Sequence, residues 1–209
     1  MNAVVQVQWF PGHMAKTRRL INENIKLVDV VLELADARVP ESSRNPLLDE
    51  LIGTKPRLLI LAKKDLADDK HTLLWTKHYQ QKGVSVLGVN SIQGLKQSKK
   101  AIIEEIRKLA HLVLARRRNK GIKNETVRTM VVGIPNVGKS TLINFLAGRG
   151  AAETGDKPGV TRGKQWIRLD KDVELLDMPG ILWTKIDDPE VGNKLAATGA
   201  INEDRKSVV

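Results

Sequence analysis

The sequence predicts an α/β fold with one doubly wound, mostly parallel sheet. Short and mostly branched apolar runs at residues 30–35, 57–62, 84–89 and 127–133 are typical of buried parallel strands. Segments with helical spacing of apolar residues lie between or beside them. A chain of 209 residues with 41% hydrophobic content is long enough for one sizeable core.

The elements follow in a regular order. Residues 13–28 form an amphipathic helix after a Pro-Gly turn, and residues 99–118 form a longer one with apolar residues on one face. A polar interval at 119–126 precedes the strand 127–133, and the next helix, from residue 139, ends at Gly148. The segments 165–169 and 173–177 then form an antiparallel hairpin.

The stretch GIPNVGKS, residues 133–140, matches G-x-x-x-x-G-K-[ST] between a predicted strand and a predicted helix. Glycines at both ends let the backbone approach phosphate, the lysine reaches the outer phosphates, and the serine hydroxyl suits magnesium. The positive end of the helix adds to this site. We therefore predict that a nucleoside triphosphate contacts Asn136, Val137, Gly138, Lys139, Ser140 and Thr141.

Two further stretches complete a phosphate site. VELLDMPG ends an apolar strand with Asp177, a second magnesium ligand, and a turn whose Gly180 N–H faces the terminal phosphate. KPGVTRG supplies Thr161, which we expect to close on magnesium when the last phosphate is present. Alone, the Asp-x-Pro-Gly pattern is weak, and the second stretch also fits an ordinary surface loop.

Only about seventy residues follow the phosphate loop, too few to complete an ordinary domain of this type. The missing half precedes the loop. KKD, at Lys63, Lys64 and Asp65, follows the strand 57–62 and resembles a guanine-recognition motif, and Asn90 and Ser91 follow the strand 84–89 where a second base loop is expected. We predict one domain over 1–209: a base-recognition half at 1–118, a linker at 119–126 and a phosphate-binding half at 127–209.

Charge and composition restrict the partners. The net charge is +11 and the pI is near 9.9, with basic clusters at 16–26 and 115–123, which favours RNA over a neutral partner. Low aromatic content predicts contacts to RNA backbone and shape rather than stacking on bases. The chain has no cysteine, no metal-type histidine spacing and no long apolar run. We expect a cytoplasmic monomer that does not enter membranes.

Six stretches together resemble the ribosome biogenesis GTPase A family of circularly permuted GTPases: WFPGHMAK, ELADARVP, GIPNVGKSTLIN, KPGVT, DMPGILW and LAATGAI. The resemblance spans about residues 9–201. It implies a P-loop GTPase fold with permuted motif order, Mg-GTP and GDP as ligands, and a slow GTPase switch on the maturing large (50S) ribosomal subunit, in contact with rRNA and ribosomal proteins. It also implies a helical C-terminal RNA-binding domain, which we do not expect within 1–209.

Three positions qualify this resemblance. Ala62 stands where the family motif begins with asparagine, so we expect weaker nucleotide binding by about 1 kcal/mol. Ile181 stands where Ras-type enzymes carry the glutamine that orients water, and the resemblance makes His13 the candidate for that role. Asn136 matches the position that binds potassium in a subset of similar GTPases.

Two other interpretations remain at this point. The chain can be an ATP-using P-loop enzyme, which a nucleotide competition assay would detect. It can also be an RNA- or ribosome-binding scaffold with a vestigial nucleotide site, which the basic charge and Ala62 favour and which turnover on ribosomal subunits would exclude.

Overall fold

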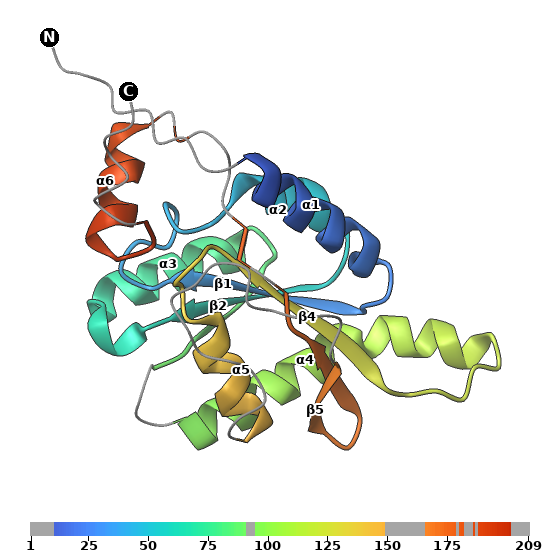
Figure 1. The fold of residues 1–209 in the computed structure, drawn as a ribbon. Coiled ribbons are helices and arrows are strands. Elements are labelled where there is room, and N and C mark those ends of the chain that lie inside the picture. Colours follow the sequence, from blue (N-terminus) through green and yellow to red (C-terminus); the bar gives the residue numbers. More distant parts are fainter. Residues whose placement is uncertain are drawn as a thin grey trace, which may run out of the picture.

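The computed structural model describes residues 11–90, 95–148, 166–178, 180–181, 186 and 188–201. Its centre is a six-stranded sheet in the order β3-β2-β1-β4-β6-β5, with helices on both faces (Figure 1). Every neighbouring pair is parallel except β5 and β6, which pair antiparallel. The prediction of a doubly wound, mostly parallel sheet with a final hairpin is confirmed.

The strands agree closely with the apolar runs of the sequence. Their bounds are β1 Val30–Asp36, β2 Arg57–Ala62, β3 Ser85–Gly88, β4 Val127–Gly133, β5 Trp166–Asp170 and β6 Val173–Leu176. Strand β1 is buried along its whole length, as a central parallel strand covered on both faces must be. Strands β1 and β4 lie side by side and join the parts of the chain before and after the interval 119–126 into one sheet.

The helices surround this sheet. Their bounds are α1 Pro11–Ile25, α2 Pro46–Ile52, α3 Asp69–Gln81, α4 Leu95–Asn119, α5 Lys139–Ala147 and α6 Pro189–Ala197, with a 3₁₀ turn, η1, at Lys64–Leu66. Helices α1 and α2 lie on one face, and α4 and α5 lie on the other (Figure 1). The sequence pattern indicated α1, α4 and α5 directly, whereas α2 and α6 are short helices that begin at a proline after an Asn or Asp cap.

Strand β2 shows how one element serves two cores. Leu58 and Ile60 belong to the main cluster, whereas Leu59 and Leu61 pack in a second cluster with Tyr79 of α3. Successive side chains point to opposite faces of a strand, so a continuous apolar run is what a sheet covered on both sides requires.

The C-terminal half of α4 extends beyond the sheet, and the chain returns from it through residues 120–126 to β4 (Figure 1). We call residues 111–126 the arm. Arg117 fixes its base, because its guanidinium donates to the Asp29 carboxylate at 2.5 Å and to the Thr126 carbonyl at 3.1 Å. None of the helices in the described ranges is long and apolar enough to cross a membrane.

Candidate nucleotide-binding site

The residues that the sequence singled out arrive at one edge of the sheet. Strands β1, β2, β3, β4 and β6 are parallel, so their carboxyl ends lie together, and ligands bind at this edge in open α/β sheets. The phosphate loop, residues 133–138, follows β4, the Lys63–Asp65 motif follows β2, and Asp177 follows β6. The loop also lies where the strand order changes direction, between β1 and β4, which is the expected position for a phosphate site.

The phosphate loop has the backbone that its glycine pattern predicted. Gly138 caps α5 with φ of 107°, a conformation that disfavours any side chain, and α5 begins at the next residue. The Lys139 ammonium donates to the Ile134 carbonyl at 2.7 Å and is only 9% exposed. Burial lowers the pKa of Lys139 to about 8, although the Asp177 carboxylate raises it. A buried cation beside exposed helix N–H groups is a suitable place for phosphate.

Asp177 and Gly180 lie against this loop. Burial raises the pKa of Asp177, and the Lys139 ammonium opposes that shift. A Cβ on Gly180 would stand 2.8 Å from the Lys139 Nζ and 3.0 Å from the Pro135 nitrogen, so a side chain here would crowd the lysine and the phosphate loop. Buried Ile181 fixes the same turn, because its N–H donates to the Gly133 carbonyl at 3.1 Å.

A cavity of about 260 Å³ opens on the base-recognition side. Its walls are mostly apolar and come from β1, β2 and α5, and residues of both predicted half-sites line it: Ala62, Lys63, Asn90, Gly138 and Thr141. Asp65 lies nearby in η1 and is exposed. Lys64 is directed elsewhere, with its ammonium 3.5 Å from Asp69 and its stem against Gly88. The size suits a planar base, and the apolar walls suit its faces.

Asp36 and Arg38, which the sequence did not assign to the site, support the contact between its two halves. That contact is made by Lys63, whose ammonium donates to the Asn136 carbonyl in the phosphate loop at 3.1 Å and lies 3.0 Å from the Asp36 carboxylate. Asp36 in turn accepts two hydrogen bonds from the Arg38 guanidinium, at 2.9 and 2.7 Å. Both residues stand in the ELADARVP stretch, so the signal was present, but nothing in that stretch says which side chains it meets.

Several predicted residues cannot be placed in this geometry. Ser91 and Thr161 lie outside the described residues. His13 lies in the first turn of α1, and that end of the helix lies toward the nucleotide edge because α1 runs back along β1 before the turn at 26–29 (Figure 1). The orientation of its side chain is outside the description. Within the described ranges, no group of three His, Cys, Asp or Glu residues is arranged to hold a metal.

Known proteins resemble this chain in fold and in sequence. A family described as "50S ribosome-binding GTPase" matches residues 128–207. The ribosome biogenesis GTPase A of Bacillus pumilus is 49% identical over 197 residues, which are 94% of this chain and 69% of that protein. The chain belongs to the ribosome biogenesis GTPase A family. A crystal structure of GNP-bound YlqF from Thermotoga maritima superposes with a TM-score of 0.66 at 29% identity, over 91% of this chain and 68% of that one.

Membership of the ribosome biogenesis GTPase A family confirms the resemblance seen in the six stretches. A GDP-bound structure of YlqF also matches, with a TM-score of 0.62 at 28% identity, over 90% of this chain and 71% of that chain. The ATP-using interpretation loses its support, because the family is one of GTPases.

Proposed function

We propose that this chain binds Mg-GTP at the carboxyl edge of its sheet, hydrolyses it slowly and acts as a nucleotide-dependent switch in assembly of the large ribosomal subunit. The observation that carries the proposal is the convergence of the base motif, the phosphate loop and the Asp177 turn at one edge, in a chain of the ribosome biogenesis GTPase A family. In this proposal the domain divides into a base-recognition half at 1–118 and a phosphate-binding half at 127–209, joined through 119–126.

The proposed roles follow from side-chain chemistry. Asp65 accepts the two edge donors of guanine that adenine lacks, and Asn90 with Ser91 forms the second base loop. Lys139 pairs with the outer phosphates, and the Gly180 N–H donates to the terminal one. In this assignment Lys63 supports the phosphate loop from the base side, through the carbonyl of Asn136.

A magnesium ion fits the donor set. The Ser140 hydroxyl, the Thr161 hydroxyl and the Asp177 carboxylate are hard oxygen ligands, and Asp177 is a partly buried carboxylate with a raised pKa, so an added cation would stabilise its ionised form. When bound, magnesium neutralises phosphate charge. The chain itself contributes a fixed loop backbone and a buried lysine that orient the same phosphates.

We also propose that Asn136 holds a potassium ion with its side-chain oxygen. The amide nitrogen of Asn136 donates to the Gly199 carbonyl at 3.1 Å, which leaves the amide oxygen as the group for a cation. Equal turnover in sodium and potassium would reject this role.

The attacking water requires a polar partner other than residue 181. Ile181 is 1% exposed and its side chain neither donates nor accepts. We propose that His13, in the first turn of α1 near the nucleotide edge, orients the water once the ribosomal subunit fixes the segment that carries it. His13→Ala should then abolish subunit-stimulated hydrolysis and leave GTP affinity nearly intact. Full stimulated turnover in that variant would assign the water to backbone, potassium or a ribosomal group.

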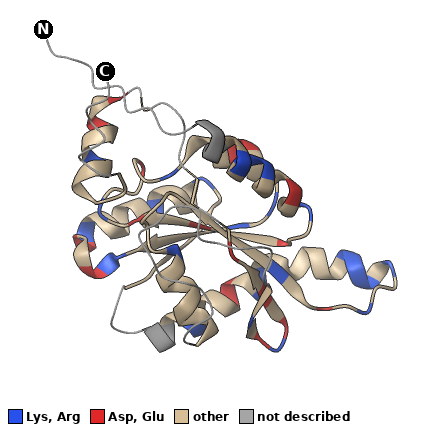
Figure 2. Cartoon of the chain, viewed as in Figure 1, with Lys and Arg blue, Asp and Glu red and all other residues tan. Residues whose placement is uncertain are grey.

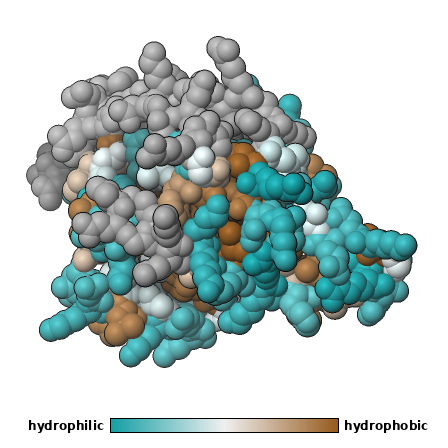
Figure 3. All heavy atoms as spheres, turned by 90° about the horizontal axis from the view of Figure 1, so that it is seen from below, coloured by the Kyte–Doolittle hydropathy of each residue, from teal (hydrophilic) through white to brown (hydrophobic). Residues whose placement is uncertain are grey.

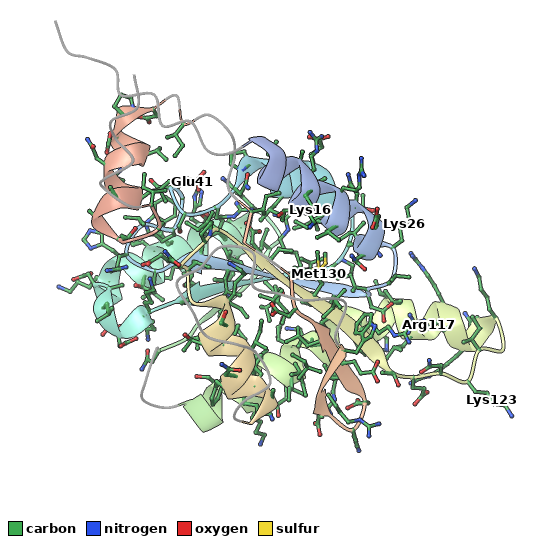
Figure 4. All side chains as sticks on the ribbon, in the orientation of Figure 1. Lys16, Lys26, Glu41, Arg117, Lys123 and Met130 are labelled. Carbon is green, nitrogen blue, oxygen red and sulfur yellow. The ribbon has the colours of Figure 1, made fainter. Side chains whose placement is uncertain are left out.

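The proposed ribosomal contact is mainly electrostatic. Lys and Arg positions recur along α1 and in the arm (Figure 2), and much of the described surface seen from below is hydrophilic (Figure 3). In the arm, Arg117 is half-buried and paired with buried Asp29, whereas Arg116, Arg118, Lys120 and Lys123 are exposed, Arg118 in a surface ion pair with Glu125. Lys123 extends from the end of the arm, Lys16 extends from α1, and Lys26 extends from the turn just after it (Figure 4). This divides the 115–123 cluster into a structural part and a part open to RNA.

Co-sedimentation with large subunits tests the switch. The affinity of the chain for the subunit should differ between a GTP analogue and GDP, and equal affinity with both nucleotides would contradict a switch.

Asp65→Asn should relax the preference for guanine over adenine in a competition assay, because leaving a polar group of the site unmatched costs about 1 to 3 kcal/mol. If the unmodified protein binds ATP and GTP equally, the assignment of Asp65 is wrong.

Binding to the subunit should also weaken steeply with salt, because each lysine or arginine contact to phosphate releases counterions. Replacing Arg116, Lys120 and Lys123 with glutamine should flatten that dependence without disturbing the paired arginines. Lys70 and Lys77 on α3 and Lys82 at its end are exposed and supply three matched control substitutions. An unchanged salt slope in the arm variant would make the cluster a solvated surface only.

A further inference from the structure

Two residues of the site have an unusual backbone. Lys63 and Asn136 have φ of 58° and 56°, and they are the non-glycine residues with positive φ among those described. Side chains disfavour this left-handed region, so it persists where the surroundings fix it, frequently at ligand sites. These two residues also touch, since the Lys63 ammonium donates to the Asn136 carbonyl at 3.1 Å. A hydrogen bond therefore links the two positions with unusual backbone.

Asp36 holds the lysine in place. Its carboxylate is 3% exposed and lies 3.0 Å from the Lys63 ammonium. Arg38 binds both carboxylate oxygens through its guanidinium, and its backbone N–H donates to one of them at 3.1 Å. Burial raises the pKa of Asp36, but the hydrogen bonds from Arg38 and the nearby Lys63 outweigh it, so that the pKa falls below its usual value. Asp36 is thus a fixed anion between two cations.

The same residues reach the end of α6. The Arg38 guanidinium donates to the Thr198 carbonyl at 3.2 Å, and the Asn136 amide nitrogen donates to the Gly199 carbonyl at 3.1 Å. Carbonyls at the end of a helix lack intrahelical partners and attract donors and positive charge. The contacts close a polar ring of Arg38, Asp36, Lys63, Asn136 and the Thr198–Gly199 end of α6.

We propose that Arg38 is a positioning residue for nucleotide binding, which holds Lys63 against the phosphate loop through Asp36 and joins α6 to the same group. This inference rests on the proposed guanine-nucleotide site. The hydrogen bonds of Arg38 go to Asp36 and to the Thr198 carbonyl, so its effect on the predicted phosphate and base residues must pass through the polar ring. Binding of nucleotide at the phosphate loop then stabilises the end of α6, and a well-ordered end of α6 in turn favours nucleotide binding.

The first test compares three variants for affinity toward GDP and a GTP analogue. Arg38→Met should weaken both by about tenfold, which is the loss of a charged hydrogen bond that orients the site. Arg38→Lys keeps the charge without the two-pronged geometry and should recover part of the loss. Arg107→Met is the matched control, because Arg107 makes a similar paired contact to Asp170 and Asp172 near the β5–β6 turn, away from the site. Its affinity should match the unmodified protein.

A double-mutant cycle separates positioning from a general loss of structure. In a Lys63→Met background, Arg38→Met should change GDP affinity less than about twofold, because its effect passes through the lysine. Arg107→Met should leave GDP affinity unchanged both in the unmodified protein and in the Lys63→Met variant. Arg38→Met binding as tightly as the unmodified protein, or losses that multiply in the double variant, would overturn the proposal.

Amide exchange at α6 supplies an independent measurement. GDP should slow exchange at the backbone amides of residues 195–201 in the unmodified protein and in Arg107→Met, but not in Arg38→Met. If the unmodified protein bound no guanine nucleotide, the proposed function would fail. The polar ring would still be tested, because Arg38→Met alone should speed exchange at these amides, and unchanged exchange would reject it.

Discussion

Strand β1 has a buried aspartate at each end, and the two have different consequences. Asp29, just before the strand, accepts from the Arg117 guanidinium at 2.5 Å and from the Arg128 backbone N–H at 3.0 Å. Asp36, the last residue, accepts two hydrogen bonds from the Arg38 guanidinium and also pairs with Lys63. Each end of β1 thus has a buried Asp–Arg pair, and the two aspartates are about 23 Å apart along the strand at ~3.3 Å per residue.

The difference lies in what the partners connect. Asp29 joins the starts of β1 and β4 to the base of the arm, so its contacts hold together the two parts of the chain on either side of 119–126. The partners of Asp36 reach the phosphate loop and the end of α6. A buried Asp-Arg pair is therefore no evidence of function by itself. Its place at the carboxyl or the amino edge of a parallel sheet decides what it serves.

The largest effect should come from the carboxyl edge. Lys139→Met should weaken guanine-nucleotide binding by roughly a hundredfold or more, because it removes the buried cation that faces phosphate. The same change should raise the free energy of unfolding by roughly 1 to 3 kcal/mol, since it removes a charge that is costly to bury. Nucleotide titration and urea unfolding measure the two effects. Unchanged affinity would remove Lys139 from the site.

At the amino edge of the sheet we expect the opposite, a loss of stability with no loss of nucleotide affinity. Arg117→Met should lower the free energy of unfolding by roughly 2 kcal/mol, because it leaves the mostly buried Asp29 carboxylate without its guanidinium. Arg116→Met, at the neighbouring exposed arginine, should change it by less than about 0.5 kcal/mol. Both should bind GDP normally. A nucleotide defect in Arg117→Met would mean that the two ends of β1 are coupled.

The pH dependence sharpens the contrast further. The pKa of Lys139 is about 8 in the folded protein and near its ordinary value of 10.5 in the unfolded chain. Between these values the unfolded chain holds more protons, so the contribution of Lys139 to stability should rise with pH across this window. Phosphate binds the ammonium form, so GDP affinity should fall above pH 8 by up to about tenfold per pH unit. Calorimetry in buffers of different ionisation enthalpy should detect proton uptake on binding, and its absence at pH 9 would contradict this.

The smallest effect concerns Ala62. Its Cβ lies 4.0 Å from the position of a Cβ on Gly138, and both residues line the cavity that an asparagine side chain would enter. Ala62→Asn should tighten GDP binding by about fivefold, equivalent to one added hydrogen bond of about 1 kcal/mol. The hydroxyl of Ala62→Ser does not extend as far as an asparagine amide, so this variant should leave affinity unchanged. An equal gain in both variants would point to a local backbone effect instead.

The sequence predicted the site better than it predicted the contacts within it. The glycine pattern at 133–140 and the position of KKD after an apolar run were sufficient to bring the phosphate loop and Lys63 to one edge. Arg117 was included in a cluster expected to contact RNA, yet it is largely committed to Asp29 and Thr126. A run of arginines looks the same in a sequence whether or not a carboxylate lies opposite, because that carboxylate is 88 residues away.

By itself the sequence determined the strands, the helices α1, α4 and α5 and their order, because apolar periodicity and glycine or proline positions are local properties of the chain. It also determined the family, through motifs whose residue types are set by phosphate and guanine chemistry. Only the tertiary structure decided which charges are partners. Arg38, Asp36, Lys63, Asn136 and the end of α6 come from separate stretches, and the electrostatic interaction between them depends on distances and burial that arise when the parallel sheet brings its strand ends together.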